Sequence, residues 1–216
     1  MLKTFRSLRF AVAVLGLGLV TLTLFIIPAP AKAGPTKVDD ETLKNLQTAY
    51  NGESNASARY LAFAERADEE GYLAVATLFR AASRAEQIHA QNHAVVIKML
   101  GGVPNAQIEA PLVKSTRENL QASIEGESYE RDTMYPEFLA AARSVQNRDA
   151  IRTFTYAKTA EAEHANLYQA ALDDLEGMSS AKTFYVCTVC GMTTTNLDFE
   201  RCVSCFNKKD KYVAVS

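Results

Sequence analysis

The chain contains two copies of one ligand pattern, in which a lone glutamate is followed later by Glu-x-x-His. The two glutamates of a copy are 33 residues apart in the first copy and 34 in the second. The members are Glu53, Glu86 and His89 in the first copy, and Glu127, Glu161 and His164 in the second. Residues three apart on a helix project from the same side, so each Glu-x-x-His offers an oxygen and a nitrogen to one point.

All six of these side chains fall on apolar stripes at helical spacing, which places them inside the fold. Several carboxylates buried together are costly unless cations lie between them. One Glu from each of two helices, with Glu-x-x-His from each of two others, is the ligand set of two-metal carboxylate bundles. The pattern therefore predicts a non-haem di-iron site, with a di-manganese or mixed pair as the alternative.

The two copies differ at one informative position. Glu130 follows Glu127 by three residues, whereas the matching position of the first copy is Ala56. Glu130 is therefore predicted as a seventh ligand that makes the site asymmetric, and a carboxylate just outside the coordination shell is the alternative. Tyr60 and Tyr135 lie about two helical turns beyond the lone glutamates. There a phenol can orient a carboxylate or a bound oxygen species, or simply pack in the core.

A third histidine lies on the same stripe as the first Glu-x-x-His. His93 follows His89 by one turn, and Tyr168 holds the equivalent place in the other half. We expect both side chains to hydrogen-bond from outside the coordination shell, and direct ligation by His93 is the alternative.

Four cysteines near the C-terminus form two Cys-x-x-Cys pairs separated by eleven residues: Cys187 and Cys190, then Cys202 and Cys205. This spacing places four sulfurs around one tetrahedral ion, either iron or zinc. The residues around them, 183–216, are too few to fold on an apolar core alone, so the metal would also staple the module. Two disulfides are the alternative, because the chain is expected to be exported.

Hydrophobic periodicity and helix stop signals predict four long helices that carry the ligands, at about 39–70, 72–100, 115–145 and 147–177. Pro136 lies inside the third helix and should kink it. The long link 101–114 joins two antiparallel hairpins. The predicted fold is therefore mainly α: a four-helix bundle over 38–177, followed by a small strand-and-turn module over 183–216.

The first 33 residues have a basic start, an apolar run from Ala11 to Ile27 and an Ala-Lys-Ala end. These features predict a Sec signal peptide cleaved after Ala33, and hence a periplasmic or other extracytoplasmic protein. An uncleaved membrane anchor is the alternative. Cleavage would remove four basic and no acidic residues, so 23 basic and 25 acidic residues would become 19 and 25. No basic stripe remains to support nucleic-acid binding.

The bundle and the cysteine module together resemble rubrerythrin, a ferritin-like di-iron bundle followed by a rubredoxin-like Fe(Cys)4 module. The resemblance covers about residues 38–214. Two stretches carry it most specifically: Asn119-Leu120…Gly126-Glu127-Ser128-Tyr129-Glu130…Met134-Tyr135-Pro136-Glu137-Phe138, and Tyr185-Val186-Cys187…Cys190-Gly191.

The resemblance implies roles for particular residues. It places the di-iron ligands at Glu53, Glu86, His89, Glu127, Glu130, Glu161 and His164, the site tyrosines at Tyr60 and Tyr135, and the ligands of one further iron at the four cysteines. It also implies an oxidoreductase that reduces hydrogen peroxide to water in oxidative-stress protection. Electrons would come through the Fe(Cys)4 centre from a rubredoxin- or reductase-like donor protein, in a homodimer arranged head to tail.

The second cysteine knuckle departs from the family pattern. It lacks the usual proline after Cys202, and Phe206 stands where the family usually has glycine. Glycine allows the positive φ that aims backbone amides at sulfur, whereas phenylalanine disfavours it. The choice between iron and zinc in the four-cysteine site therefore stays open.

Other functions fit the same residues. The main alternative is a ferroxidase or an iron- or manganese-handling protein whose four-cysteine site holds structural zinc. Visible absorbance separates the two, because a ferric Fe(Cys)4 centre is strongly coloured and a zinc centre is not. A di-iron oxygenase and a peroxide-sensing signalling protein are further alternatives.

Overall fold

The computed structural model of this chain describes residues 37–216, with side chains described from residue 40 onward. The predicted signal peptide, 1–33, lies outside the described residues. Among the helices that are described, none has the length and apolar character needed to cross a membrane.

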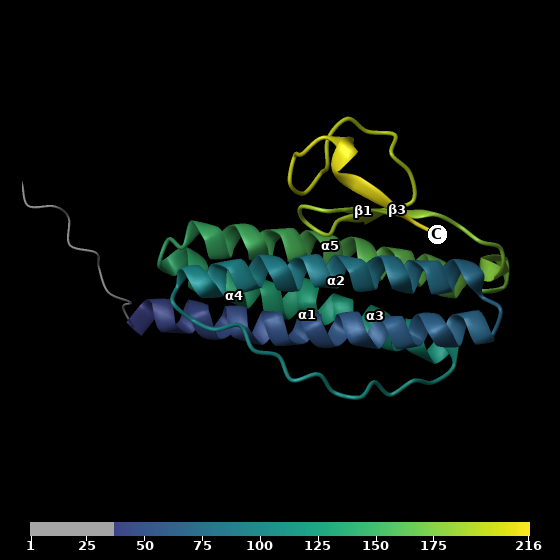
Figure 1. Ribbon diagram of the computed structural model, residues 1–216, viewed down its shortest axis with the longest axis horizontal. Coiled ribbons are helices and arrows are strands. Elements are labelled where there is room, and N and C mark those ends of the chain that lie inside the picture. The colour runs from purple at the N-terminus through teal and green to yellow at the C-terminus, as the bar shows by residue number, and fades with distance from the viewer. Residues whose placement is uncertain (1–36) are drawn as a thin grey trace, which may run out of the picture. The chain divides into compact units, whose positions relative to one another are not determined.

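Long helices form a bundle, and a small sheet follows them in the chain (Figure 1). The helices are α1 (Lys37–Glu69), α2 (Leu73–Met99), α3 (Thr116–Tyr129), α4 (Tyr135–Ser144) and α5 (Arg148–Asp173), with a π-helical turn, η1 (Glu130–Met134), between α3 and α4. Figure 1 shows α1, α2 and α5 running side by side, with α3 and α4 lying end to end as the remaining rod. The predicted helical bundle with a C-terminal strand module is confirmed.

The third rod is not the uniform α-helix that the periodicity predicts over 115–145. It begins as expected, because Ser115 caps α3 and forms a reciprocal capping box with Glu118. The chain then widens into η1, where the amide of Tyr135 donates to the carbonyl of Glu130, five residues back. Pro136 follows at once; it has no N–H and its ring would crowd the carbonyl four residues back, so a wider turn relieves the conflict.

The last helix is shorter than predicted. It starts at the expected cap, where the side chain of Asn147 accepts a hydrogen bond from the amide of Ala150. It ends at Asp173 rather than near Gly177, because Asp174 leaves the helical region with φ −123° and ψ 50°. A short 3₁₀ turn, η2 (Glu176–Ser179), then leads toward the sheet.

The long connection between the hairpins is fastened along α1 by asparagine side chains. The amide group of Asn55 accepts from the backbone of Glu109 at 2.8 Å and donates to the carbonyl of Gln107 at 2.9 Å. One turn earlier, Asn51 accepts from the amide of Gln107 at 2.9 Å. These hydrogen bonds explain how a segment without regular structure is held in place.

The C-terminal module is a three-stranded antiparallel sheet in the order β2-β1-β3. Its strands are β1 (Phe184–Cys187), β2 (Thr193–Thr194) and β3 (Tyr212–Val215), with a short turn, η3 (Lys209–Lys211), before the last. Tyr185 pairs with Thr194 on one side, and Cys187 pairs with Tyr212 on the other. The sheet packs on the bundle (Figure 1), where β1 and β3 contact α2, and β2 contacts α2 and α5.

Two apolar clusters fill the bundle on either side of the ligand residues. One contains Tyr60, Phe63, Phe79 and Tyr168. The other contains Tyr135, Phe154 and smaller side chains. Because both clusters are apolar, the polar groups between them have to satisfy one another or bind ions.

Candidate metal centres

The six duplicated ligand residues meet in the middle of the bundle, all of them buried. They form two overlapping groups of four: Glu53, Glu86, His89 and Glu161 in one, and Glu86, Glu127, Glu161 and His164 in the other. Within each group the donor atoms lie within 4.8 Å of one another. Glu86 and Glu161 belong to both groups, so the two ion positions share these carboxylates.

Orphaned polar atoms show that this cluster fits cations. One oxygen each of Glu53 and Glu86, both oxygens of Glu161, and Nδ1 of His164 are buried without a hydrogen-bond partner among the described residues. Buried polar groups are nearly always paired, so unpaired carboxylate oxygens aimed at one place need an ion. Carboxylate and imidazole donors of this kind suit iron, manganese or zinc.

The charges of the cluster lead to the same conclusion. Burial, together with neighbouring carboxylates, holds the pKa values of Glu53, Glu127 and Glu130 well above the usual range. Without cations the protonated form of these groups is favoured, and metal binding must displace the protons.

The two ligand histidines are oriented by the cysteine module. Nδ1 of His89 lies 2.8 Å from Glu86 inside the cluster, while Nε2 lies 3.0 Å from the carbonyl oxygen of Cys190. Because a carbonyl only accepts, Nε2 of His89 carries the proton and Nδ1 is free to bind metal. In the same way, Nδ1 of His164 lies 2.9 Å from Glu161, and Nε2 lies 2.9 Å from the hydroxyl of Thr193.

The predicted site tyrosines support the lone glutamates in a crossed arrangement. The hydroxyl of Tyr60, from α1, donates to Glu127 of α3. The hydroxyl of Tyr135, from α4, donates to Glu53 of α1. Burial, with the charge of the accepting glutamate next, raises the pKa of both phenols well above the usual range, so both stay protonated donors.

His93 lies behind this arrangement, as the sequence suggests, and belongs to neither group of donors. Its Nε2 is 3.1 Å from the hydroxyl of Tyr135, and its Nδ1 is 2.9 Å from the hydroxyl of Thr153. Because Tyr135 donates its proton to Glu53, its oxygen accepts from Nε2 of His93, and Thr153 must then donate to Nδ1. Burial lowers the pKa of His93 to about 3, so the ring is neutral in this chain of hydrogen bonds.

Glu130 lies beside the cluster but outside both groups of donors. It is the first residue of η1, and its side chain is only partly buried by surface area. Its charge is the largest carboxylate contribution, after burial, to the raised pKa of Glu53. Its role as a seventh ligand stays a prediction.

The four cysteines converge on a single point in the module. They are free thiols, with Sγ atoms 3.7 Å apart between Cys187 and Cys205 and 3.5 Å apart between Cys190 and Cys202. Disulfide sulfurs lie about 2 Å apart. A tetrahedral ion with metal–sulfur bonds of about 2.3 Å holds its sulfurs about 3.8 Å apart, so this spacing fits a metal site.

Phe206 adopts the turn that its side chain disfavours. Its φ is +58°, and its amide donates to the carbonyl of Cys202 at 3.0 Å. The first knuckle has the same turn, with φ +76° at Gly191 and a bond from its amide to Cys187 at 2.9 Å. The departure in sequence therefore leaves the backbone of the second knuckle unchanged.

Comparisons with known proteins agree with both centres. The Rubrerythrin family model matches residues 44–172. Nigerythrin of Nitratidesulfovibrio vulgaris is 41% identical over 174 residues, which cover 80% of this chain and 86% of that protein. Rubrerythrin-2 of Clostridium acetobutylicum is 39% identical and covers 78% of this chain and 94% of its own length. The chain belongs to the rubrerythrin family. A solved structure of fully reduced, all-ferrous nigerythrin superposes with a TM-score of 0.75 at 39% identity, over 80% of this chain and 86% of that one.

Membership of the rubrerythrin family and the observed donor set together support an oxidoreductase of the di-iron oxidative-stress class with a four-cysteine metal site. The bundle and the module also contact each other through side chains that the sequence does not mark as ligands. Thr193, Thr153 and Asn92 carry no metal-ligand signal in the sequence, yet Thr193 and Asn92 form hydrogen bonds between the bundle and the module, and Thr153 bonds to His93 inside the bundle. Asn92 donates to the carbonyl of Val189 at 2.9 Å.

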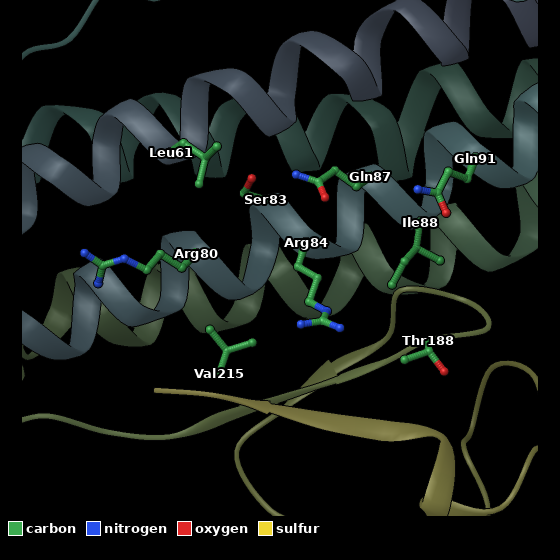
Figure 2. Close-up of a pocket in the computed structure, with 9 residues that line it drawn as sticks. All are labelled: Leu61, Arg80, Ser83, Arg84, Gln87, Ile88, Gln91, Thr188 and Val215. Carbon is green, nitrogen blue, oxygen red and sulfur yellow. The ribbon is translucent and has the colours of Figure 1, made fainter.

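A cavity of about 520 Å³ lies between α2 and the module, away from the ligand side chains. Figure 2 shows Arg80, Arg84 and Ile88 of α2 along one side and Thr188 and Val215 of the module along the other. None of its lining residues is a predicted ligand. This cavity is therefore a gap beside the docked module rather than the place of the chemistry.

Proposed function

We propose that this chain is a non-haem di-iron peroxidase that reduces hydrogen peroxide to water, with electrons supplied through an Fe(Cys)4 centre. The reaction consumes two electrons and two protons for each peroxide and yields two water molecules. Two ferrous ions held by the carboxylate–histidine cluster would supply both electrons for cleavage of the O–O bond. The ligands in this proposal are the six duplicated residues, with Glu130 as a seventh.

The observation that carries the proposal is that His89 joins the two centres. Its Nδ1 lies among the carboxylates of the cluster, and its Nε2–H donates to the carbonyl of Cys190. One side chain therefore connects a cysteine of the module to the di-metal site. A zinc staple needs no such connection, whereas an electron relay does.

The remaining residues act on protons and orientation. Tyr60 and Tyr135 stay protonated and hold the two lone glutamates in place. Behind Tyr135, His93 and Thr153 form a path of hydrogen bonds along which a proton can be replaced after donation. The dry apolar clusters on either side exclude bulk water.

In this proposal the physiological reductant is an electron-carrier protein, and the refilling step is one electron at a time. A head-to-tail homodimer, in which a module serves the neighbouring bundle, and Sec export remain part of the proposal. The contact between His89 and Cys190 is made within the single described chain, so in the head-to-tail dimer the two modules would exchange places and each would make this contact with the neighbouring chain.

The test is metal analysis with a visible spectrum, followed by peroxide consumption assayed with an electron donor. Three irons per chain, a visible ferric Fe(Cys)4 band and catalytic peroxide loss are expected. Cys190→Ser should remove the band and the donor-linked turnover while leaving iron in the bundle. Zinc in the four-cysteine site combined with rapid oxidation of added ferrous iron by oxygen would instead support the ferroxidase alternative.

A further inference from the structure

The two knuckles of the cysteine module have the same backbone but opposite surroundings. The first knuckle lies against the bundle, where a Cβ on Gly191 would overlap the imidazole of His89. The second knuckle carries Phe206 at the equivalent position, with 70% of that side chain exposed. Cys205, the one cysteine of the four that is not buried, belongs to the second knuckle. The metal site therefore has one face toward the di-metal centre and one toward solvent.

Phe206 is costly at this position and gains little packing in return. A bulky residue with positive φ is a genuine outlier, and such strained residues cluster at functional sites. Its exposed ring adds little to the core, and Val203 of the same knuckle is 66% exposed. Exposed aromatic side chains are enriched in protein interfaces. An aromatic ring kept at a strained position beside a metal site fits contact with another molecule.

Two basic side chains near Phe206 also lie opposite each other, which lowers the local stability of the knuckle. Arg201 and Lys208 pair directly across an isolated antiparallel bridge, where like charges repel. The guanidinium of Arg201 donates to the carbonyl of Phe206 at 3.0 Å, so the cation lies beside the backbone of this turn. Residues 201–209 contain three basic and no acidic side chains. Only Lys209 among them forms an ion pair within the described residues, with Glu200 at 3.4 Å.

This basic face stands out because the rest of the chain is acidic. Outside residues 201–209, residues 34–216 contain 16 basic and 25 acidic side chains, and of the acidic ones Glu53, Glu86, Glu127 and Glu161 are buried. A ferric ion with four thiolates adds a further negative charge, which would repel an acidic partner. Cations around the knuckle offset that repulsion and steer an acidic partner to this face.

We infer that the second-knuckle face, formed by Arg201, Val203, Phe206 and Lys208, is the docking surface for an acidic one-electron carrier protein. The inference rests on the proposed function, since it requires iron in the four-cysteine site. In the step it serves, the reduced carrier loses one electron and the ferric iron of that site becomes ferrous, and no bond or proton is exchanged. Two such transfers replace the electrons used for each peroxide.

The experiment uses a small acidic [2Fe–2S] ferredoxin as the probe and the full iron-loaded protein. Stopped-flow absorbance follows bleaching of the ferric Fe(Cys)4 band after mixing with reduced ferredoxin. Arg201→Glu/Lys208→Glu should lower the second-order rate constant about tenfold or more at low ionic strength. The difference should nearly vanish in 1 M salt, where the screening length is about 3 Å. The matched control is Lys44→Glu/Arg117→Glu, two exposed cations of α1 and α3 with the same total change in charge.

Phe206→Gly tests the ring separately from the charges. Glycine suits the positive φ, so the turn should persist. The rate constant with ferredoxin should fall at both low and high ionic strength, because the contact rather than the charge is removed. A wild-type rate in both Phe206→Gly and the charge-reversal variant would overturn the docking surface.

Reduced methyl viologen, a small cation, separates this inference from the proposed function. The charge-reversal variant should accept electrons from viologen at least as fast as the wild type and should still consume peroxide. If viologen supports no peroxide turnover in the wild type, the peroxidase proposal fails, whatever ferredoxin does. If the wild type binds anionic phospholipid vesicles through this face and ferredoxin does not compete, the face serves a membrane and the carrier assignment is wrong.

Discussion

Gly191→Ala should separate the two metal centres without replacing a ligand of either. Gly191 has a positive φ, and a Cβ at this position would overlap the ring of His89. Because Nδ1 of His89 belongs to the donor group of the di-metal site, the ring keeps its place and the module moves away, so the hydrogen bond from His89 to Cys190 is lost. Phe206 shows that a side chain is compatible with this knuckle turn when nothing lies against it.

The size of the effect follows from the contacts that dock the module. Alanine in the left-handed region costs about 1–2 kcal/mol through the backbone alone. Three side-chain hydrogen bonds join bundle and module here, from His89, Asn92 and His164. At about 0.5–1.5 kcal/mol each, their loss weakens the docked arrangement by about 1.5–4.5 kcal/mol. Since about 1.4 kcal/mol is a factor of ten, transfer through that arrangement should slow by about tenfold or more.

The assay starts with iron-loaded protein in which both centres are reduced. Rapid mixing with one equivalent of peroxide oxidises the di-iron site, and the visible band of the ferric Fe(Cys)4 centre then reports internal electron transfer. The wild type should form this band as soon as the di-iron site is oxidised. Gly191→Ala should consume the peroxide at a similar initial rate and form the band at least about tenfold more slowly.

Gly71→Ala is the matched control. Gly71 also has a positive φ, of +82°, but nothing lies within 4 Å of its would-be Cβ. It should lose about 1–2 kcal/mol of stability from the backbone and keep the wild-type rate of band formation. If Gly191→Ala forms the band as fast as Gly71→Ala, the contact through His89 is not the electron path.

Three further results are expected. Glu130→Gln leaves both groups of four donors intact, so two metals should remain in the bundle. Peroxide turnover should nevertheless fall about tenfold or more, because a carboxylate beside the site is lost. Loss of metal instead would make Glu130 an essential ligand. Tyr135→Phe should slow turnover about tenfold more than Tyr60→Phe, because only Tyr135 continues to His93; equal effects would remove the proton path. Metal-free protein should lose thermal stability as pH rises from about 5 to 8. Burial raises the pKa values of Glu53 and Glu127 in the folded state, so the folded protein holds protons that the unfolded chain releases above about pH 4.3. Calorimetry should show the opposite trend when divalent metal is added, and a flat profile for the metal-free form would contradict the burial argument.

The ligand set of the bundle could be predicted because its signal is periodic and duplicated. Glu86 and His89 need only the three-residue spacing of a helix to reach one point, and the second copy repeats the pattern. The cysteine spacing has the same local character. These features depend on short-range geometry, which a sequence carries directly.

The crossing of the tyrosines could not be predicted in the same way. Tyr60 follows Glu53 on one helix, yet it donates to Glu127 on another. Which neighbour a side chain meets across a bundle depends on the rotation and offset of whole helices, and spacing within one helix does not contain that information. The widened turn η1 was also beyond the periodicity, although Pro136 marked where regular geometry would fail.

The departures from symmetry between the two halves gather around one of the two metal positions, the one that contains Glu53 and His89. Glu130 acts most strongly on Glu53 among the neighbouring carboxylates. His93 backs the tyrosine that holds Glu53, whereas the hydroxyl of Tyr168, at the equivalent place, has no hydrogen-bond partner among the described residues.

The carbonyl of Cys190 reaches the same position through His89, while the other ligand histidine meets only a threonine hydroxyl of the module. A symmetric pair of ions has no reason to concentrate an additional carboxylate, a hydrogen-bond path and a cysteine contact on one side. The proposed peroxidase reaction would give such a reason, because each O–O bond broken consumes electrons and protons in equal number. Delivery of both at the position that contains Glu53 and His89 would let their arrival be coupled.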